Sequence, residues 1–316
     1  MRRNRDPFII GLVAGVLSAC FYTGANIGLR WVATTCDPTT VAFVKAIPIA
    51  LAASVMVVVN VARGIRAWPS VPWLVRLVLS AIFMQLAGNL AFQWALGQIG
   101  LTLTVPLCIG TLLIGSAVLS RIWLVEPITQ RSLLAILLLI ASIVVLSLVA
   151  HESAASVRQL EVDQVSFVLL AGGIGAACLS GVAYALGNVV IRKALAEPMP
   201  VATALSIMSL TGVVLLGGLS LRHGTATVTA IGMENLGAMV LAGVFNAVAF
   251  YSLARALQLL SVIQVNLICA SQVAMSAACG VIFFEEPAGI FQLGGIGLTI
   301  AGLVTMSRQA KTVGDG

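Results

Sequence analysis

The sequence predicts an all-α integral membrane protein whose ten membrane-spanning helices form two inverted repeats of five helices each. Two observations carry this prediction. Apolar residues make up 60% of the chain and charged residues only 9%, whereas soluble domains carry about 25% charged residues. In addition, one pattern of four polar residues occurs twice at the same spacing. The composition indicates a lipid environment, and the repeated pattern indicates a duplication.

The repeated pattern consists of Ser, Tyr, Asn and Arg at steps of four residues. It lies in residues 15–30 and returns 162 positions later in residues 177–192. Steps of four stay on one side of an α-helix and drift by about 40° each. Each copy is therefore expected to be a helix with one polar stripe, and such repeats point to two halves of one design. The stripes are Ser18, Tyr22, Asn26 and Arg30, and then Ser180, Tyr184, Asn188 and Arg192.

Apolar runs of about 18 or more residues with few charges mark the individual spans. The first span of each half is followed by a proline break, at Asp37-Pro38 and at Glu197-Pro198, because the residue before a proline is pushed out of the helical conformation. The expected spans are residues 8–33, 39–62, 72–98, 101–121, 129–150, 164–194, 200–220, 234–258, 261–284 and 288–307.

The later spans of the two halves also match each other. Glu126-Pro127 and Glu286-Pro287 lie at an offset of 160 residues. Since each half holds five spans, an odd number, the two copies enter the membrane in opposite directions and form an inverted repeat. We therefore expect a first repeat in residues 1–150, an extracytoplasmic linker in 151–163, and a second repeat in 164–316 that ends in a short cytoplasmic tail.

The net charge of +6 is explained by membrane topology rather than by nucleic-acid binding. With the N-terminus inside, most basic residues fall on the cytoplasmic side, Arg63 and Arg131 among them, whereas Arg30, Arg158 and Arg222 are assigned to the opposite side. This asymmetry follows the positive-inside rule. It predicts a multi-pass protein of a bacterial-type cytoplasmic (inner) membrane with both termini in the cytoplasm.

The N-terminal region also admits a different interpretation. Leu17-Ser18-Ala19-Cys20 is similar to the cleavage box of a bacterial lipoprotein. Cleavage there would destroy the first polar stripe, and the second copy carries Cys178 in an uncleaved context. Retention of the first span is the favoured interpretation, and lipoprotein processing is the alternative.

Polar residues inside the spans are the candidate substrate-binding residues. We expect them to line a central cavity, because stripes recur in the helices that a transporter would need. The alternative for each residue is that it only forms a hydrogen bond to a neighbouring helix, worth about 0.6 kcal/mol. The candidates are Tyr22, Asn26, Lys45, Gln85, Asn89, Tyr184, Asn188, Asn246, Gln264 and Gln272.

Lys45 is the candidate with a charge. A lysine at mid-membrane costs on the order of 2.5–3.5 kcal/mol. Its amine either reaches outward along its apolar stem or faces the cavity, where it would be a partner for a carboxylate. The residue at the corresponding position of the second half is Ile207, so this charge breaks the symmetry of the repeat.

Motifs of enzymes are missing from the sequence: it contains no GxSxG, HExxH, Walker A or GxGxxG pattern. The six cysteines form no CxxC pair, and both histidines lie in predicted loops, so we expect neither a metal site nor a cofactor. The acidic residues fall in loops or at span ends. This distribution favours uniport or exchange over proton antiport.

Two five-helix halves, a short fourth span that closes in Glu126-Pro127, and a glycine-rich last span at 291–297 resemble the EamA type of the drug/metabolite transporter superfamily. The resemblance covers nearly the whole chain. It implies ten spans, cytoplasmic termini, a central cavity and alternating access, often in exporters. The family's glutamate near the end of spans four and nine would correspond to Glu126 and to Glu286 or Glu285.

The sequence thus predicts a permease and not an enzyme: a secondary transporter, acting in efflux or exchange, of a small organic metabolite such as an amino acid. It would work by alternating access around a cavity between the two repeats. The expected partners are a small-molecule substrate and the lipid bilayer, with no nucleic acid; a monomer and a homodimer both remain open. The alternative from another class is a non-transporting scaffold or receptor on the same fold.

Overall fold

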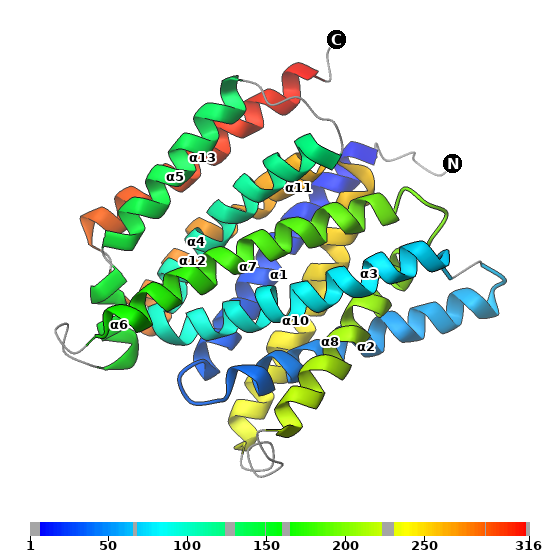
Figure 1. Cartoon of the computed structure of the whole chain (residues 1–316), viewed down its shortest axis with the longest axis horizontal. Helices are drawn as coiled ribbons and strands as arrows, with labels where there is room; N and C mark the ends of the chain where they lie inside the picture. Colours follow the sequence, from blue (N-terminus) through cyan, green and yellow to red (C-terminus); the bar gives the residue numbers. More distant parts are fainter. Residues whose placement is uncertain are drawn as a thin grey trace.

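The computed structural model of the chain describes residues 7–65, 68–123, 130–148, 150–159, 165–222, 231–287 and 289–313. Within these ranges all regular secondary structure is helical. The long helices lie side by side in a bundle (Figure 1). The helices of the first half are α1 (Pro7–Val32), α2 (Pro38–Ala62), α3 (Val71–Phe83), the π-helix η1 (Met84–Leu90), α4 (Ala91–Trp123), α5 (Gln130–Leu148) and α6 (Ala150–Arg158). Those of the second half are α7 (Phe167–Ala194), α8 (Val201–Arg222), α10 (Met233–Leu259), α11 (Val262–Cys269), α12 (Gln272–Phe284) and α13 (Ile290–Val313).

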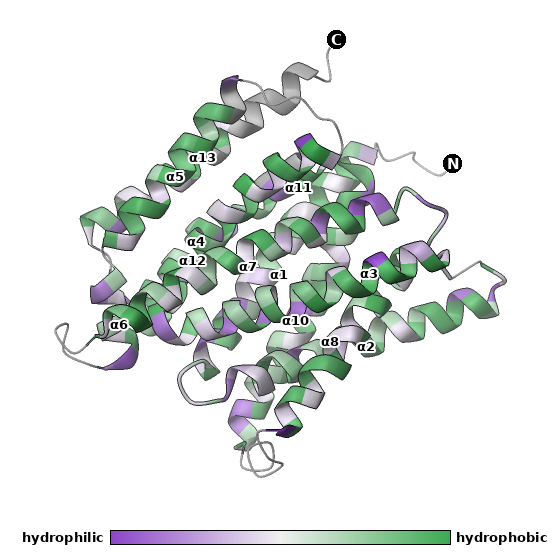
Figure 2. Ribbon diagram, viewed as in Figure 1, coloured by the Kyte–Doolittle hydropathy of each residue, from purple (hydrophilic) through white to green (hydrophobic). Residues whose placement is uncertain are grey.

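The helices have the surface of a multi-pass membrane protein. Six helical runs within the described residues are long and apolar enough to cross a membrane: α1, α2, the continuous run Val71–Trp123, α7, α8 and α10. The bent pair of α5 and α6 would be a seventh. Hydrophobic residues cover the helices along their lengths (Figure 2), and large ones such as Val214 and Ile282 are exposed. An apolar exterior of this kind suits contact with lipid chains.

The ends of the helices agree with most of the predicted spans; α1, for example, spans Pro7–Val32 where residues 8–33 were expected. The two expected spans 72–98 and 101–121 instead form one run of 53 residues. This run is interrupted at Gly100, whose backbone angles (φ 77°, ψ 179°) are not helical. The expected span 261–284, by contrast, is not one continuous helix: it is divided into α11 and α12 on either side of residues 270–271.

The expected linker at 151–163 is partly structured. Helix α6 occupies its first residues and packs against α4 and α7. Ala154 and Val157 are buried, and Val157 approaches Gly100 so closely that a side chain on that glycine would collide with it. The small apolar residues between the polar ones form a buried face of α6. This face was not predicted from the sequence, because the segment as a whole is polar. The rest of the linker, residues 160–164, lies outside the described residues.

Helix pairs connect the two halves of the chain. Helix α1 packs along α10, and α7 packs along η1 and α4; α2 packs on α8, and α5 on α13. Helices α1 and α7 run in opposite directions (Figure 1). Each major contact therefore joins a helix of the first half to a helix of the second.

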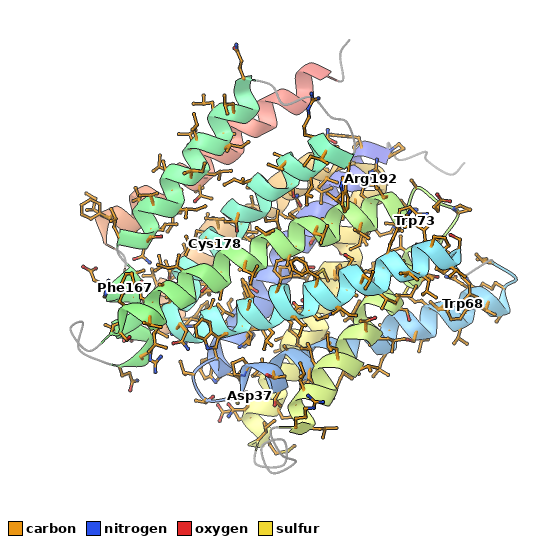
Figure 3. All side chains as sticks on the ribbon, in the orientation of Figure 1. Asp37, Trp68, Trp73, Phe167, Cys178 and Arg192 are labelled. Carbon is orange, nitrogen blue, oxygen red and sulfur yellow. The ribbon has the colours of Figure 1, made fainter. Side chains whose placement is uncertain are left out.

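The two ends of the bundle differ in chemistry. Trp68, Trp73 and Arg192 lie at the end where α1 begins and α13 ends, and Asp37 and Phe167 lie at the opposite end (Figure 3). The guanidinium of Arg76 stacks over the Trp73 ring at 4.9 Å. Tryptophans and basic residues at one level are typical of a membrane–water interface.

A buried ion pair lies at the Asp37 end of the bundle. Arg30, assigned from the sequence to the side opposite the termini, is buried in the last turn of α1, with its Nε 2.8 Å from Glu286 Oε1. Its guanidinium also lies over the Phe284 ring at 5.1 Å. Hydropathy placed this charge near a span end but gave no information about its buried partner.

Glu286 also caps the second part of α4. Its carboxylate accepts hydrogen bonds from the backbone N–H groups of Leu101 (2.8 Å) and Thr102 (2.7 Å) and from the Thr102 hydroxyl. These N–H groups have no helical partner because the chain breaks at Gly100. Glu285, which ends α12 in the left-handed conformation (φ 53°), turns the chain so that Glu286 reaches this helix start.

We predict that Glu286→Gln strongly destabilises the protein. The change keeps the side-chain shape but leaves Arg30 buried without a counter-charge, and breaking a buried pair in this way costs about 3–5 kcal/mol. Thermal unfolding of the purified full-length chain in detergent measures the effect. The matched control is Glu285→Gln, because Glu285 is adjacent and exposed. Equal unfolding midpoints for the two variants would contradict the assignment.

We also predict that Gly100→Ala destabilises the chain. The backbone conformation of Gly100 is essentially restricted to glycine, and a Cβ there would lie 2.5 Å from Glu286 Oε1. Gly175→Ala is the control, because nothing lies within 4 Å of the added methyl. The same unfolding assay should show a lower midpoint for Gly100→Ala only; an unchanged midpoint would mean that the break at Gly100 is not a structural requirement.

Candidate functional site

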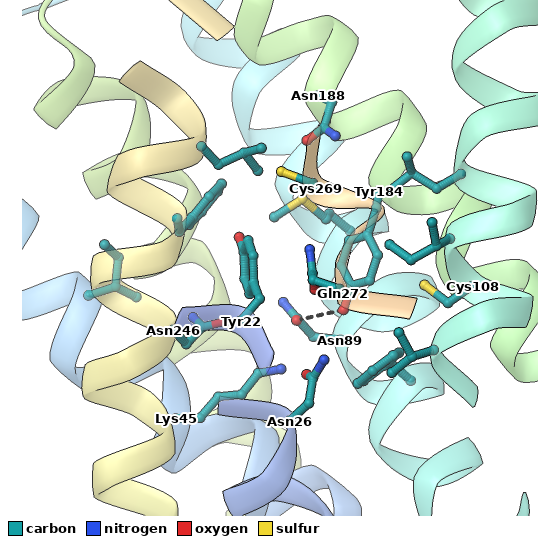
Figure 4. A pocket seen from close by; sticks show the side chains of 18 of the residues that line it. Tyr22, Asn26, Lys45, Asn89, Cys108, Tyr184, Asn188, Asn246, Cys269 and Gln272 are labelled. Atoms are coloured by element: carbon teal, nitrogen blue, oxygen red, sulfur yellow. Dashed lines mark hydrogen bonds between the residues drawn. The ribbon is translucent and has the colours of Figure 1, made fainter. Parts of the chain in front are cut away.

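A cavity of about 110 Å³ lies in the middle of the bundle, several times the space that one water molecule requires, about 10–15 Å³. Residues of α1, α2, η1, α4, α7, α8, α10, α11 and α12 line it (Figure 4). Nine of the ten candidates from the sequence line this cavity: Tyr22, Asn26, Lys45, Gln85, Asn89, Tyr184, Asn188, Asn246 and Gln272.

The tenth candidate, Gln264, lies elsewhere and has a different role. Its Oε1 accepts a hydrogen bond from the Ser261 N–H (3.0 Å), and the Ser261 hydroxyl accepts one from the Gln264 N–H (3.3 Å). This reciprocal pair is a capping box at the start of α11. The expected span 261–284 would place Gln264 and Gln272, eight residues apart, on one face of a continuous helix, but the chain breaks between α11 and α12.

A π-helix brings two amides to the cavity. In η1 the wider turn places Gln85 and Asn89 so that Asn89 Nδ2 donates to Gln85 Oε1 (2.7 Å), and Gln85 Nε2 donates to the Met208 carbonyl of α8 (3.2 Å). Single π-helical turns occur frequently at functional sites. These hydrogen bonds fix both side chains.

Tyr184 and Tyr22 enter the cavity from α7 and α1. The Tyr184 hydroxyl donates to Asn89 Oδ1 (3.0 Å; dashed in Figure 4). Gly88 permits this approach, because a Cβ there would lie 3.0 Å from the Tyr184 ring. Tyr22, by contrast, forms no hydrogen bond with any residue that the structure describes. The two equivalent tyrosines thus differ in their partners.

The equivalent asparagines of the two stripes differ in the same way. Asn188 Nδ2 donates to Asn266 Oδ1 (3.0 Å), and Asn266 Nδ2 donates to the Ser116 hydroxyl (2.7 Å), which connects α7, α11 and α4. Asn26 is buried and its amide is without a hydrogen-bond partner in the described part of the chain. Asn188 therefore bridges helices as well as lining the cavity, whereas the Asn26 amide is available to a ligand.

Sequence reasoning missed part of the wall. Phe250, Asn266, Cys269 and Cys108 also line the cavity. Phe250 lies four residues after Asn246 and so shares its helix face, which is a signal that the sequence does contain. The cysteines offered no such signal, because a buried cysteine is usually a small apolar packing residue.

We predict different stability effects for alanine substitutions of the two asparagines. Asn188→Ala removes the bond to Asn266 and should lower the free energy of unfolding by about 1 kcal/mol, within the range of about 0.6–1.7 kcal/mol for interhelical hydrogen bonds in membranes. Asn26→Ala removes no bond and should leave it unchanged. Thermal unfolding in detergent compares them, and a larger loss for Asn26→Ala would show that Asn26 has a structural partner.

Comparison with known proteins adds the following. Residues 171–308 match the model of the EamA-like transporter family. One solved crystal structure, whose description names no function, is similar with a TM-score of 0.64 and 16% identity over 96% of this chain and 98% of the other; at that identity the likeness shows the fold alone. No curated protein matches the chain.

The matched segment runs from α7 into α13 and so covers the second half of the chain. The Glu-Pro landmark of this half is repeated in the first half at Glu126-Pro127. The second half of the chain therefore resembles the EamA-like transporter family.

Proposed function

We propose that the protein is a secondary transporter of a small organic metabolite, such as an amino acid, that binds in the central cavity. The observation that carries this proposal is the position of the cavity. Polar side chains from equivalent helices of both halves, Tyr22 on α1 and Tyr184 on α7, meet there in the middle of an otherwise apolar bundle. A membrane transporter of this superfamily needs such a site, whereas a structural protein would fill the space with side chains.

Ten membrane spans in two inverted repeats are the topology that fits best. The run Val71–Trp123 has 53 residues and would be about 80 Å long as a helix, more than twice the hydrocarbon thickness of about 30 Å. Division at Gly100 gives two spans. Counting α11 with α12 as one further span and adding α5 and α13 gives ten, and the opposite directions of α1 and α7 (Figure 1) support inverted halves.

The proposed location is a bacterial-type cytoplasmic membrane, with both termini in the cytoplasm. Helix α1 begins and α13 ends at the same end of the bundle (Figure 1). Arg192, Lys193 and Arg76 belong to this end, where Lys193 Nζ lies 5.4 Å from the Trp123 ring and Arg76 stacks on Trp73. Basic residues on one side favour a cytoplasmic assignment for that side.

The chemistry of the cavity supports uniport or exchange over proton antiport. No aspartate or glutamate is among its lining residues in the described chain, so a proton-carrying carboxylate is not at hand in the site. The amides and phenols offer hydrogen bonds, and Phe92 and Phe250 offer apolar surface. A small amphipathic metabolite matches this combination.

Alternating access would require the cavity to open at each end in turn. At the Asp37 end, the Arg30–Glu286 pair joins α1 to the segment after α12, and Glu286 also holds α4. These contacts tie the two halves together at that end. We propose that they close the cavity there and separate when it opens.

We predict that Asn26→Ala abolishes most transport without unfolding the protein, because its amide lines the cavity and stabilises no helix. The measurement is counterflow of labelled amino acids and small organic acids into proteoliposomes preloaded with the same compounds. The control is Asn60→Ala, the same change near the end of α2, outside the cavity. Unchanged counterflow in Asn26→Ala would remove Asn26 from the site; ligand binding by the wild-type protein without any counterflow would favour a receptor.

A further inference from the structure

Lys45 is a buried cation without a counter-charge among the residues that the structure describes. It lies on α2 about 10 Å from the start of the helix, is 3% exposed, and lines the cavity. Its side chain extends toward Asn26 and Asn89 (Figure 4). It forms neither an ion pair nor a hydrogen bond with any residue that the structure describes.

In the described part of the chain, no acidic residue faces this amine from the surrounding helices. The lining residues of α1, α2, η1, α4, α7, α8, α10, α11 and α12 include no carboxylate within the described chain. Asp37 is the acidic residue nearest to Lys45 in the sequence. It caps α2 by accepting hydrogen bonds from the Thr40 N–H (2.9 Å) and hydroxyl (3.0 Å). Glu286 is held by Arg30.

Close packing holds the backbone of α2 at Lys45 against α10, which carries another polar group of the cavity. Gly243 of α10 lies against the backbone of α2, where a Cβ would be 2.9 Å from the Lys45 carbonyl oxygen. This contact brings Asn246, one turn further along α10, to the same part of the cavity. The side chains of Asn26, Asn246 and Tyr22 have no hydrogen-bond partner among the described residues.

An unpaired buried charge is costly, and its cost falls when an opposite charge with further hydrogen bonds is bound. A carboxylate offers two acceptor oxygens to an ammonium, an amide and a phenol. An ammonium group of a ligand, by contrast, would meet a like charge and no carboxylate. The recognition chemistry is therefore that of an anion.

The wall that α4 contributes to the cavity is largely apolar. Val105, Ile109 and Leu112 of α4 recur at steps of four and three residues and form one face of that helix. A ligand held by its carboxylate at Lys45 would place an apolar body against this face.

We infer that the cavity selects a small organic anion, with a carboxylate held by Lys45 beside Asn26 and Asn246 and an apolar body against α4. The inference rests on the proposed transport function and sharpens it, because an amino group on the ligand is not recognised. Only one half of the chain supplies the charge, since the position equivalent to Lys45 is Ile207. The substrate class is thus a monocarboxylate with an apolar side chain.

The test uses ligands that differ in one group: leucine, the 2-oxo acid with the same side chain, and 3-methylbutylamine, which lacks the carboxylate. Binding to the purified full-length protein is measured by calorimetry, and counterflow in proteoliposomes is measured in parallel. We expect the 2-oxo acid to bind at least as tightly as leucine, and the amine not to bind. Binding of the amine with equal affinity would overturn the inference.

Substitutions at Lys45 provide the second arm. Lys45→Met should weaken 2-oxo acid binding at least about ten-fold while preserving or raising the unfolding midpoint, because it removes a buried unpaired charge. Lys45→Arg should retain part of the binding. Unchanged binding in Lys45→Met would also overturn the inference. Transport of neutral or cationic compounds that does not depend on Lys45 would overturn the anion site but support the transporter proposal. Binding of the 2-oxo acid that depends on Lys45, without any counterflow, would support the anion site but overturn the transporter proposal.

Discussion

The buried carboxylate of Glu286 makes the contacts on which the arrangement of the helices depends. It accepts hydrogen bonds from Arg30 on α1 and from Leu101 and Thr102 at the start of the second part of α4. A buried carboxylate is tolerated only when it is paired and hydrogen-bonded, and a helix start in a membrane is tolerated only when its N–H groups have partners. The Glu286 carboxylate thus satisfies the N–H groups at this helix start, and those N–H groups help to satisfy the buried carboxylate. Gly100, which has no side chain, leaves space for this contact.

The two halves of the chain use equivalent side chains differently at the cavity. On α7, Tyr184 and Asn188 are engaged by Asn89 and Asn266 and so stabilise the contacts between helices. On α1, Tyr22 and Asn26 remain without partners in the described chain and face the open space. If the two stripes were perfectly symmetric, either all of their polar groups would be hydrogen-bonded, with none free for a ligand, or all would be buried without partners at a cost in stability. The asymmetry provides both a stable wall and groups available for a ligand.

Much of this arrangement follows from the sequence alone, because hydropathy and steps of four residues are local properties. They predicted most of the helix ends, and nine of the ten candidate residues chosen from them line the cavity. The exceptions depend on contacts between segments far apart in the chain: Arg30 found its partner 256 positions later, α6 found a surface to cover, and the break after Cys269 removed Gln264 from the face of Gln272. The π-helix at Gln85 was likewise not predicted, since spacing and hydropathy do not distinguish a π-helical turn from an α-helical one.

The equivalent positions at the opposite end of the bundle have another chemistry. Arg192, which corresponds to Arg30, donates to the backbone carbonyls of Leu257 (2.7 Å) and Gln258 (3.1 Å). The start of α11 is capped by the neutral Ser261–Gln264 pair where α4 uses a carboxylate. Separation at the Glu286 end would have to expose a charge pair, whereas release of Arg192 would leave only neutral acceptors unsatisfied. In an alternating-access cycle the balance between the two states would therefore be governed mainly by Glu286, and a ligand that favours opening at that end must contribute comparable binding energy.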